Sequence, residues 1–355
     1  MGTIKLENGK VISDYGKPYI IAELGSNHNG NMDLAKEMIH KAKECGADCV
    51  KFQSWTKDTI FSKKVYQDNY FLQDDYRNRT DYTLEEIVDE FSISEDQLYQ
   101  MAQICKEVGI DFSSSPFSER EVDHLVDTCH APFVKIASMD LNNYPFLEYV
   151  AKKNVPVVLA TGLSDLWEIA KAVKTIEDAG NHKIIQLHCI SVYPPKFADI
   201  HLNNILSLRM MYPDYPIGFS DHSLGVEIPS AAAALGACMI EKHFTLDKEM
   251  FGWDHKISAD PQELKALVEA AHHVQEALGS TKKTVNTDEM IKRDAFRRSI
   301  VAARDLLAGT VLTREDIDFK RPGTGITPGE AENLIGRTLK RDVAYDKMFE
   351  KEDLV

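Results

Sequence analysis

Short apolar runs and amphipathic stretches alternate along most of this chain. The apolar runs recur eight times, at Tyr19–Leu24, Cys49–Gln53, Asp111–Phe117, Phe133–Ser138, Val155–Thr161, Ile184–Cys189, Ile217–Ser220 and Met239–Phe244. Amphipathic stretches lie between most of them, for example Met32–Cys45, Ser94–Val108 and Leu166–Ala179. A short continuous apolar run is typical of a buried parallel strand, and apolar positions every three or four residues are typical of a helix. The pattern therefore predicts a repeated strand–helix unit.

The number of units indicates the fold class. Eight units in about 250 residues match the length of a (β/α)8 TIM barrel. An open, doubly wound α/β sheet would use the same units. We favour the barrel, because polar residues stand at the C-terminal end of nearly every apolar run, where such barrels carry their functional groups.

Two parts of the chain depart from the repeat. The segment from Trp55 to about Phe91 is long, charged and rich in Asp, Asn and Tyr, which suits a loop beside an active-site mouth or a surface insertion without a role. After the last unit, Gly279-Ser-Thr-Lys-Lys-Thr reads as a linker. We predict a barrel at residues 1–280, a linker at 281–295 and a small domain at 296–355 with strand-like pieces at 299–303, 310–313 and 317–320. Because about sixty residues bury little apolar surface, this domain is expected to lean on another surface.

Composition limits the partners. A net charge of −15 argues against nucleic acid or an anionic membrane, so an anionic substrate would need local Lys or Arg. No signal-peptide apolar region and no 18-residue apolar run are present, so we expect a soluble, cytoplasmic protein. The six cysteines lack metal-finger spacing and read as reduced thiols. Cys189 follows His188, but adjacent strand residues face opposite sides, which argues against a nucleophile pair.

Candidate functional groups stand at the predicted strand ends. Lys51 and Lys135 lie in apolar strands, where an unpaired ammonium group is costly to bury. With nearby serines they suggest a pocket for a phosphate and a carboxylate, although each lysine could instead pair with a core acid such as Glu23. His222 and His243 end neighbouring strands and could bind a divalent metal, or they could be ordinary histidines.

Four further acidic or basic residues stay ambiguous. Glu241 and Lys242 should face opposite sides of their strand, and either one could belong to a structural ion pair, as could Asp221. Asp254, in the loop after the last strand, could bind sugar hydroxyls or orient the metal ligands, or it could belong to a plain turn.

The motifs together resemble the sialic acid (N-acetylneuraminate) synthase family, which includes legionaminic and pseudaminic acid synthases. The resemblance covers essentially the whole chain and is specific for the family, though not for one sugar. The matching motifs are Ile21–Gly30, Val50–Gln53, Ser115–Phe117, Lys135–Ser138, Ala160–Gly162, Leu187–Cys189, Tyr193-Pro194, Gly218–His222, Glu241–Asp247 and Phe319–Gly323.

This resemblance implies a TIM barrel joined to a small C-terminal antifreeze-like (SAF, β-clip) domain. It also implies condensation of phosphoenolpyruvate with an N-acyl hexosamine, typically N-acetylmannosamine, to N-acetylneuraminate and phosphate. Carbon-3 of phosphoenolpyruvate would attack the open-chain aldehyde, water would add at carbon-2, and phosphate would leave with C–O cleavage. The implied homodimer is domain-swapped, so that the small domain of one chain covers the barrel mouth of the other.

The resemblance also implies roles for individual residues. His222 and His243 would bind Mn²⁺, with Mg²⁺ or Co²⁺ as alternatives, and the ion would polarise the aldehyde as a Lewis acid. Glu23 would manage a proton or position the sugar. The phosphoenolpyruvate site would consist of Lys51, Ser115, Lys135, Ser138, Ser191 and Ser220. The sugar site would consist of Gln53, Tyr193 and Asp254, and the partner subunit's Arg321 would contact the N-acyl group.

Three departures from the family pattern concern the choice of sugar. Ala160 replaces a serine that many members carry, Asp140 stands at a position that is commonly Glu, and Trp253 replaces a usual Pro or Ser. They leave room for a diacetamido-trideoxy hexosamine, the precursor of legionaminic or pseudaminic acid. The segment from Arg321 to Ile326 is more similar to the sialic and legionaminic branches.

Two other classes of protein compete with this interpretation. Phosphoenolpyruvate-condensing barrels that make seven- or eight-carbon keto acids lack the C-terminal domain, so residues 296–355 count against them. A non-catalytic carbohydrate-binding protein would have no need of the intact histidine and lysine pairs.

Overall fold

The computed structural model describes residues 1–68 and 83–355. The described chain forms two compact units, Met1–Gly279 and Ser280–Val355. None of the helices in these ranges is long and apolar enough to cross a lipid bilayer.

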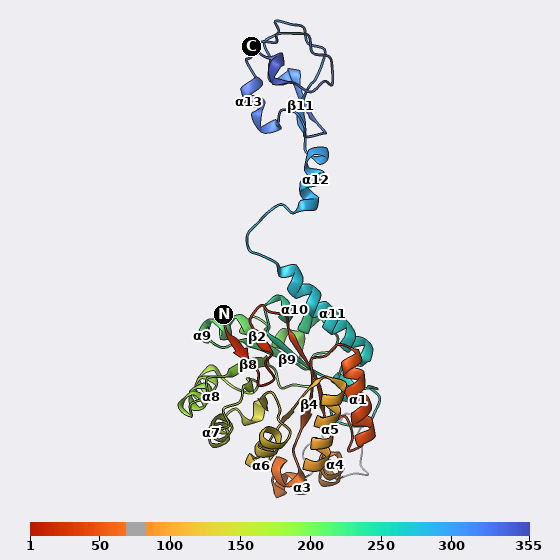
Figure 1. Ribbon diagram of the computed structural model, residues 1–355, viewed down its shortest axis with the longest axis vertical. Coiled ribbons are helices and arrows are strands. Elements are labelled where there is room, and N and C mark those ends of the chain that lie inside the picture. Colours follow the sequence, from red (N-terminus) through yellow and green to blue (C-terminus); the bar gives the residue numbers. More distant parts are fainter. Residues whose placement is uncertain (69–82) are drawn as a thin grey trace. The chain divides into compact units, whose positions relative to one another are not determined.

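The first unit is a parallel barrel (Figure 1). Its strands are β3 (Tyr19–Gly25), β4 (Cys49–Gln53), β5 (Asp111–Ser115), β6 (Val134–Ile136), β7 (Val157–Ala160), β8 (Ile184–Cys189), β9 (Ile217–Asp221) and β10 (Met239–His243). They are hydrogen-bonded in the order β5-β4-β3-β10-β9-β8-β7-β6. The first strand of the series, β3, pairs with the last, β10, which an open doubly wound sheet would not do. At the remaining seam, Ser113 Oγ donates a hydrogen bond to the carbonyl of Phe133 at 2.9 Å. The predicted barrel is confirmed as a nearly closed one.

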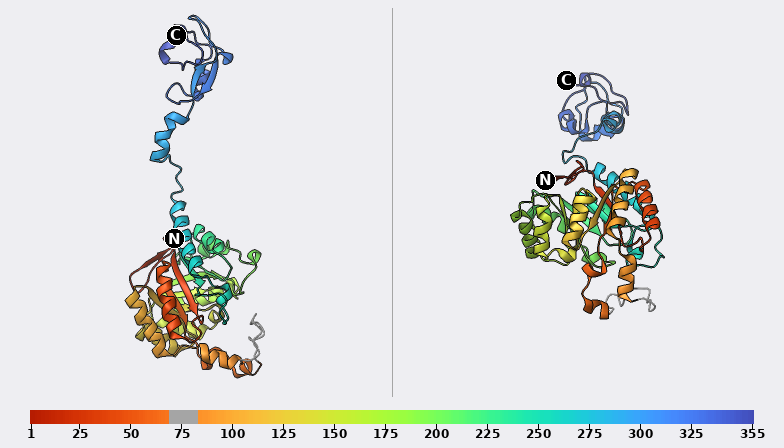
Figure 2. Two further views of the ribbon diagram at one scale, coloured as in Figure 1. Left: turned by 90° about the vertical axis from the view of Figure 1, so that its right-hand side faces the viewer. Right: turned by 60° about the horizontal axis from the view of Figure 1, so that its bottom comes forward.

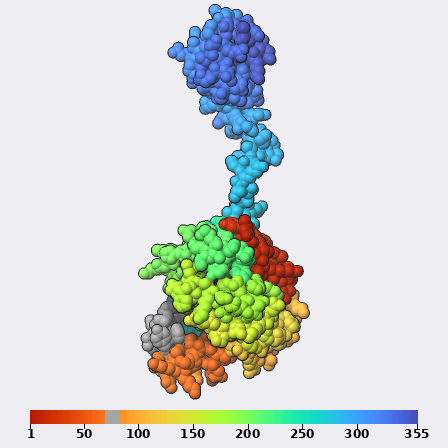
Figure 3. Space-filling model, turned by 90° about the vertical axis from the view of Figure 1, so that its left-hand side faces the viewer, coloured from red at the N-terminus to blue at the C-terminus, as the bar shows by residue number. Residues whose placement is uncertain are grey.

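Helices surround these strands. They are α1 (Met32–Glu44), α5 (Glu95–Val108), α6 (Glu119–Asp123), α7 (Tyr144–Lys152), α8 (Leu166–Asp178), α9 (Asn204–Met211), α10 (Glu227–Ala234) and α11 (Pro261–Leu278). In Figure 3 the segments coloured yellow-green to green, which include α7, α8 and α9, form much of the visible surface of this unit. A capping box of Ser94 and Gln97 forms at the start of α5, which matches the amphipathic stretch Ser94–Val108 of the sequence.

A short hairpin, which the hydrophobic pattern does not reveal, packs against the N-terminal ends of the strands. It consists of β1 (Thr3–Lys5) and β2 (Val11–Ser13), and its buried residues Ile4 and Ile12 join the cluster around Tyr19 and Ile21. Figure 2 shows this hairpin at the end of the barrel opposite α2–α4. The strand ends that carry polar residues therefore meet at the end away from the hairpin.

The segment between β4 and α5, predicted as a long loop, contains helices. These are α2 (Lys57–Ile60), α3 (Lys63–Asp68) and α4 (Leu84–Phe91), whereas residues 69–82 of the predicted loop lie outside the described residues. A capping box of Thr83 and Glu86 begins α4, which buries Leu84, Ile87, Val88 and Phe91 in a cluster with Trp55. The apolar spacing of α4 predicts a helix, but it is short and lies within a polar segment.

The second unit contains α12 (Thr287–Phe296), β11 (Ser299–Ala302), β12 (Ile317–Lys320) and α13 (Ala331–Leu334). Helix α12 begins inside the predicted linker, residues 281–295, and ends one residue beyond it. The predicted strand at 310–313 forms only a single bridge, between Val311 and Thr338. Apolar side chains that include Ile300, Leu312 and Phe349 form a buried cluster within this unit.

A buried ion pair between neighbouring strands generates a prediction about stability. Lys242 Nζ lies 2.6 Å from Asp221 Oδ2, and neither side chain is more than 2% exposed. Substitution Lys242→Met would leave a buried carboxylate uncompensated and should lower the free energy of unfolding by about 3–5 kcal/mol in urea titrations. The control, Lys174→Met, removes the exposed pair with Asp178 and should leave this energy nearly unchanged, because water and salt screen the pair. Equal effects of the two variants would contradict a structural role for the buried pair.

Candidate active site

The C-terminal ends of the strands surround a cavity of about 840 Å³. Its walls include every barrel residue that the sequence predicts for the site: Glu23, Lys51, Gln53, Ser115, Lys135, Ser138, Ser191, Tyr193, Ser220, His222, His243 and Asp254. Arg321 belongs to the second unit, where its guanidinium lies 5.2 Å from the ring centroid of Phe296. The structure therefore gathers twelve side chains from seven of the eight strands and the loops that follow them.

Four buried charges form the floor of this cavity. Lys51 Nζ lies 2.5 Å from Glu23 Oε2 and 3.7 Å from Glu241 Oε2. Lys135 Nζ lies 3.5 Å from Glu241 Oε1. None of the four side chains is more than 5% exposed. The lysines thus line the cavity and are also paired with acids. The two alternatives that the sequence left open, an anion-binding pocket and a pair with a core acid, therefore both describe part of the arrangement.

The two carboxylates on the floor differ in proton affinity. Burial raises the pKa of Glu23 above its usual range, although the Lys51 ammonium group opposes the shift. Glu241 is also buried, but Lys135 and Lys51 together lower its pKa below its usual range. Because both lysines act on Glu241, it remains ionised while Glu23 is the carboxylate better able to hold a proton.

Glu241 is a site residue that the sequence analysis left unassigned. It accepts a hydrogen bond from Ser220 Oγ at 2.9 Å, and Lys242 on the other side of β10 pairs with Asp221. Alternation along the strand could have assigned it, because residues two apart share a face and His243 points into the cavity.

The two histidines lie side by side on the cavity wall. Their ring centroids are 5.5 Å apart, and His222 Nδ1 lies 2.8 Å from the carbonyl oxygen of Ile190. His243 Nδ1 is buried without a hydrogen-bond partner among the described residues and lies 3.6 Å from Asp254 Oδ2. Tyr193 packs on His222 with a centroid distance of 4.1 Å. Among residues 1–68 and 83–355, no three His, Cys, Asp or Glu side chains are placed to hold a metal ion together.

Protonation differs between the two imidazoles. Burial and the adjacent His222 hold the pKa of His243 well below its usual range, so His243 is neutral. Burial would also lower the pKa of His222, but the charge of Cys189 raises it to about 8. A neutral imidazole has a lone pair available for a metal, whereas a proton on His222 would have to leave first.

Cys189 lies inside the cavity, whereas His188 faces away from it. Cys189 Sγ is 3.9 Å from His222 Nδ1, and His188 Nε2 lies 2.6 Å from the carbonyl oxygen of Ile200. Burial opposes ionisation of the thiol, but the charge of His222 lowers its pKa to about 7. Alternation correctly separates Cys189 from His188, and the histidine beside the thiol comes from the next strand. All six cysteines are free thiols.

Gly162 leaves room for the side chains of Ser138 and Ser191 in the cavity. A Cβ atom at Gly162 would lie 2.7 Å from Ser138 Oγ and closer still to Ser191 Oγ. Lys51 Nζ donates a hydrogen bond to Ser115 Oγ at 3.0 Å. One serine hydroxyl therefore contacts Lys51, and a side chain at Gly162 would displace the hydroxyls of Ser138 and Ser191.

The other wall of the cavity is apolar and aromatic. Trp55 and Trp253 meet edge to face at 6.2 Å, and Phe117 and Phe61 line the same cavity. Gln53 bridges the two regions, since its Nε2 donates to Glu23 Oε1 and its Oε1 accepts from Trp55 Nε1. Ala160 and Trp253, two of the unusual positions, line the cavity, whereas Asp140 is not among the described residues that do. The sequence singles out Trp253 and offers the segment that begins at Trp55 as a loop beside the mouth, but it does not predict an aromatic wall.

Two family patterns match the chain. The NeuB family matches residues 38–283, and the SAF domain matches residues 297–355. Both matches agree with the family that the motifs resemble.

Named relatives span nearly the whole chain. The N,N'-diacetyllegionaminic acid synthase of Legionella pneumophila is 38% identical over 330 residues, which cover 92% of this chain and 91% of that protein. The N-acetylneuraminate-9-phosphate synthase of Homo sapiens is 36% identical over 350 residues, which cover 98% and 96%. The crystal structure of N-acetylneuraminic acid synthetase from Leptospira borgpetersenii, in complex with citrate, has a TM-score of 0.72 and 32% identity over 82% of this chain and 94% of that one. The chain therefore belongs to the NeuB family, in which it is similar to proteins named as sialic and legionaminic acid synthases.

Proposed function

We propose that this protein condenses phosphoenolpyruvate with an unphosphorylated N-acyl hexosamine, giving a nine-carbon α-keto acid and phosphate. The observation that carries the proposal is the pair of buried ammonium groups, Lys51 and Lys135, on a floor rich in serines beside two imidazoles. The family membership and the names of the relatives support the same reaction.

Phosphoenolpyruvate would bind at the charged floor. Its phosphate and carboxylate would take hydrogen bonds from Lys51 and Lys135 and from the hydroxyls of Ser115, Ser138, Ser191 and Ser220. Without substrate, the carboxylates of Glu23 and Glu241 compensate the positive charges of the two lysines. The anion would compete with these carboxylates for the ammonium groups, which favours a proton on Glu23.

The histidine pair fits a divalent ion such as Mn²⁺, with Mg²⁺ or Co²⁺ as alternatives. His222 and His243 would hold it, because His243 is neutral and has a buried nitrogen without a hydrogen-bond partner among the described residues. When bound, the ion would supply Lewis acidity at the aldehyde oxygen. Two protein ligands make a weak site, so the substrates would complete it.

The residues of the chain would carry out the remaining steps. The floor would hold phosphoenolpyruvate so that carbon-3 faces the aldehyde, and water would add at carbon-2 before the C–O bond to phosphate breaks. Glu23 would hold the proton that the aldehyde oxygen takes up, since burial raises its pKa, and Gln53 Nε2 would fix its orientation. Trp55 and Phe117 would limit the access of bulk water to the reacting carbons.

The acceptor sugar would lie between the histidines and the aromatic wall. The first candidate for the acceptor is N-acetylmannosamine, which Tyr193 and Asp254 would bind through hydrogen bonds. The apolar side chains of Trp55, Trp253 and Phe61 favour a second candidate, a diacetamido-trideoxy hexosamine, because its methyl groups would pack on them. Among the described lining residues the lysines are Lys51 and Lys135, both paired with acids, so a sugar phosphate finds no additional cation.

A domain-swapped homodimer would complete this site. Large apolar side chains are exposed on the segments that follow β7 and β8, including Leu163, which lines the cavity, at 72%, Trp167 at 64% and Phe197 at 67% exposure. Exposed apolar groups of this size are typical of surfaces that another chain covers. In the proposed dimer the small domain of the second chain lies there, and the partner subunit's Arg321 contacts the N-acyl group.

Phosphate release is the direct test of the reaction. With phosphoenolpyruvate and Mn²⁺, we expect release with N-acetylmannosamine or with a diacetamido-trideoxy hexosamine, and the larger kcat/KM identifies the native class of acceptor. N-acetylmannosamine 6-phosphate should be a poor acceptor, and a chelator should abolish release. Sugar binding without release from any acceptor would contradict the proposal and favour a carbohydrate-binding protein.

Loss of one imidazole should remove the metal. In His222→Ala, Mn²⁺ affinity measured by electron paramagnetic resonance in the presence of phosphoenolpyruvate should fall by about 100-fold or more, and phosphate release should fall with it. His182→Ala, a histidine that does not line the cavity, is the control and should bind Mn²⁺ as the parent does. Unchanged Mn²⁺ binding in His222→Ala would show that the metal assignment is wrong.

Coexpression of two inactive variants can test the domain swap. A chain with His222→Ala and a chain with Arg321→Ala should each lose most activity, but their heterodimer would contain one site with both residues intact. Random pairing should then restore about a quarter of the parent activity. Coexpression of His222→Ala with His243→Ala should restore none, since both residues belong to one barrel. No recovery in the first mixture would contradict the swap.

A further inference from the structure

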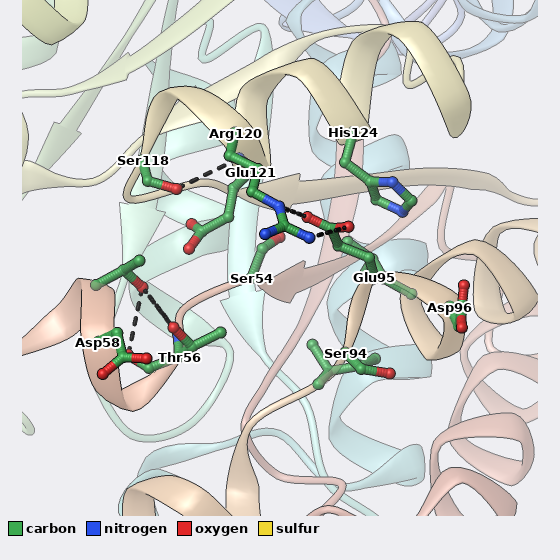
Figure 4. Close-up of a pocket in the computed structure, with 13 residues that line it drawn as sticks. Ser54, Thr56, Asp58, Ser94, Glu95, Asp96, Ser118, Arg120, Glu121 and His124 are labelled. Carbon is green, nitrogen blue, oxygen red and sulfur yellow. Dashed lines mark hydrogen bonds and ion pairs between the residues drawn. The ribbon is translucent and has the colours of Figure 1, made fainter.

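A second cavity, of about 530 Å³, lies next to the active-site cavity. It is enclosed by the connection after β4 and by the first turns of α5 and α6 (Figure 4). Most of its lining residues are of polar type, and the full set is Ser54, Thr56, Asp58, Thr59, Ile93, Ser94, Glu95, Asp96, Leu98, Ser118, Arg120, Glu121 and His124. Among the described residues the two cavities share no lining residue, and the proposed reaction makes no use of this one.

Glu121 places a buried carboxylate in this cavity. The residue is only 7% exposed, and its Oε2 accepts a hydrogen bond from the backbone N–H of Phe117 at 2.6 Å. Its Oε1 has no hydrogen-bond partner of normal geometry in the described part of the chain, although burial raises the pKa of this carboxyl group and the hydroxyls of Thr59 and Ser118 act to lower it. In Figure 4 the carboxylate extends from α6 into the cavity. An unsatisfied buried acceptor is destabilising, so a donor supplied by a ligand would stabilise it.

The charges around the cavity favour a cation. Carboxylates of Asp58, Glu95 and Asp96 join Glu121 in its lining. Arg120 is already engaged, because its Nε and Nη2 donate to the two carboxylate oxygens of Glu95 at 2.6 and 2.9 Å. The remaining carboxylates therefore leave a net negative charge in the cavity.

The size and donor set favour an organic ligand over a metal ion. No three His, Cys, Asp or Glu side chains among residues 1–68 and 83–355 are placed to hold a metal ion together. The volume is typical of a cavity for a small molecule. We propose that this cavity binds a small organic cation with a primary ammonium group, whose N–H donates to Glu121 Oε1.

Two hydrogen bonds connect this cavity to the active site. Glu121 Oε2 holds the backbone of Phe117, and Phe117 lines the active-site cavity. The backbone N–H of Ser54 donates to the carbonyl of Ser115, whose hydroxyl accepts from Lys51 Nζ. A cation on Glu121 would weaken its bond to Phe117 and so change the wall against which the sugar lies. This coupling rests on the proposed function, whereas the binding itself does not.

Calorimetric titration of the full-length protein with putrescine tests the proposal. We expect saturable binding of one putrescine per chain and none of butanediol, which has the same chain length without the charges. Glu121→Gln keeps an acceptor for Phe117 but removes the charge, and should weaken putrescine binding by about tenfold or more. Asp58→Asn, at an exposed position of the lining, should weaken it by about threefold without disturbing the fold. The control is Glu119→Gln, on the same helix but outside the lining, which should bind as the parent does.

The alternatives give different results. Equal binding of butanediol, unchanged binding in both Glu121→Gln and Asp58→Asn, or binding of K⁺ or Mg²⁺ in place of putrescine would overturn the proposal. Displacement of putrescine by phosphoenolpyruvate alone would also overturn it, by placing the amine in the active site. The coupling is supported if putrescine changes the KM for the sugar in the parent and in Glu119→Gln but not in Glu121→Gln. Because binding is measured without turnover, failure of the proposed reaction and failure of this site are separate outcomes.

Discussion

The burial of two ammonium groups is the constraint on which the site depends. Lys51 and Lys135 are nearly inaccessible to water on the floor of the cavity, where an uncompensated charge would cost several kcal/mol. Glu23 and Glu241 lie close enough to balance that charge, and Ser220 in turn holds Glu241. The parallel barrel makes this arrangement possible, because it brings β3, β4, β6 and β10 together at one end although they are far apart in the sequence.

The barrel could be predicted because a parallel strand buried on both faces leaves a continuous apolar run. The runs at Cys49–Gln53 and Ile184–Cys189 coincide with β4 and β8. The elements that were missed bury few residues each. The N-terminal hairpin has two three-residue strands, and α4 is an eight-residue helix within a polar segment. Hydrophobic patterns over so few residues cannot be distinguished from those of a loop.

For the site, residue type could be predicted but pairing could not. Strand ends indicate Glu23, Lys51, His222 and His243, and these do line one cavity. Which acid balances which lysine depends on strand register, and Cys189 meets His222 only because β8 pairs with β9. The second cavity leaves no sequence signal at all. Its serines and threonines are helix caps and turn residues, whose local roles conceal that they enclose a common space.

The same two lysines affect the ionisation of the two acids on the floor differently. Glu241 lies within 4 Å of both ammonium groups and keeps its charge, so it serves as the fixed counterion. Of the two ammonium groups, Glu23 contacts only that of Lys51, and burial raises the pKa of Glu23, so a small change in local charge decides whether it carries a proton. In the proposed reaction that change is the arrival of an anion at Lys51. The anion would weaken the attraction between Lys51 and Glu23, raise the pKa of Glu23 further and leave it protonated beside the acceptor aldehyde. The acid would then be ready only when phosphoenolpyruvate is bound, which links proton delivery to the presence of the first substrate.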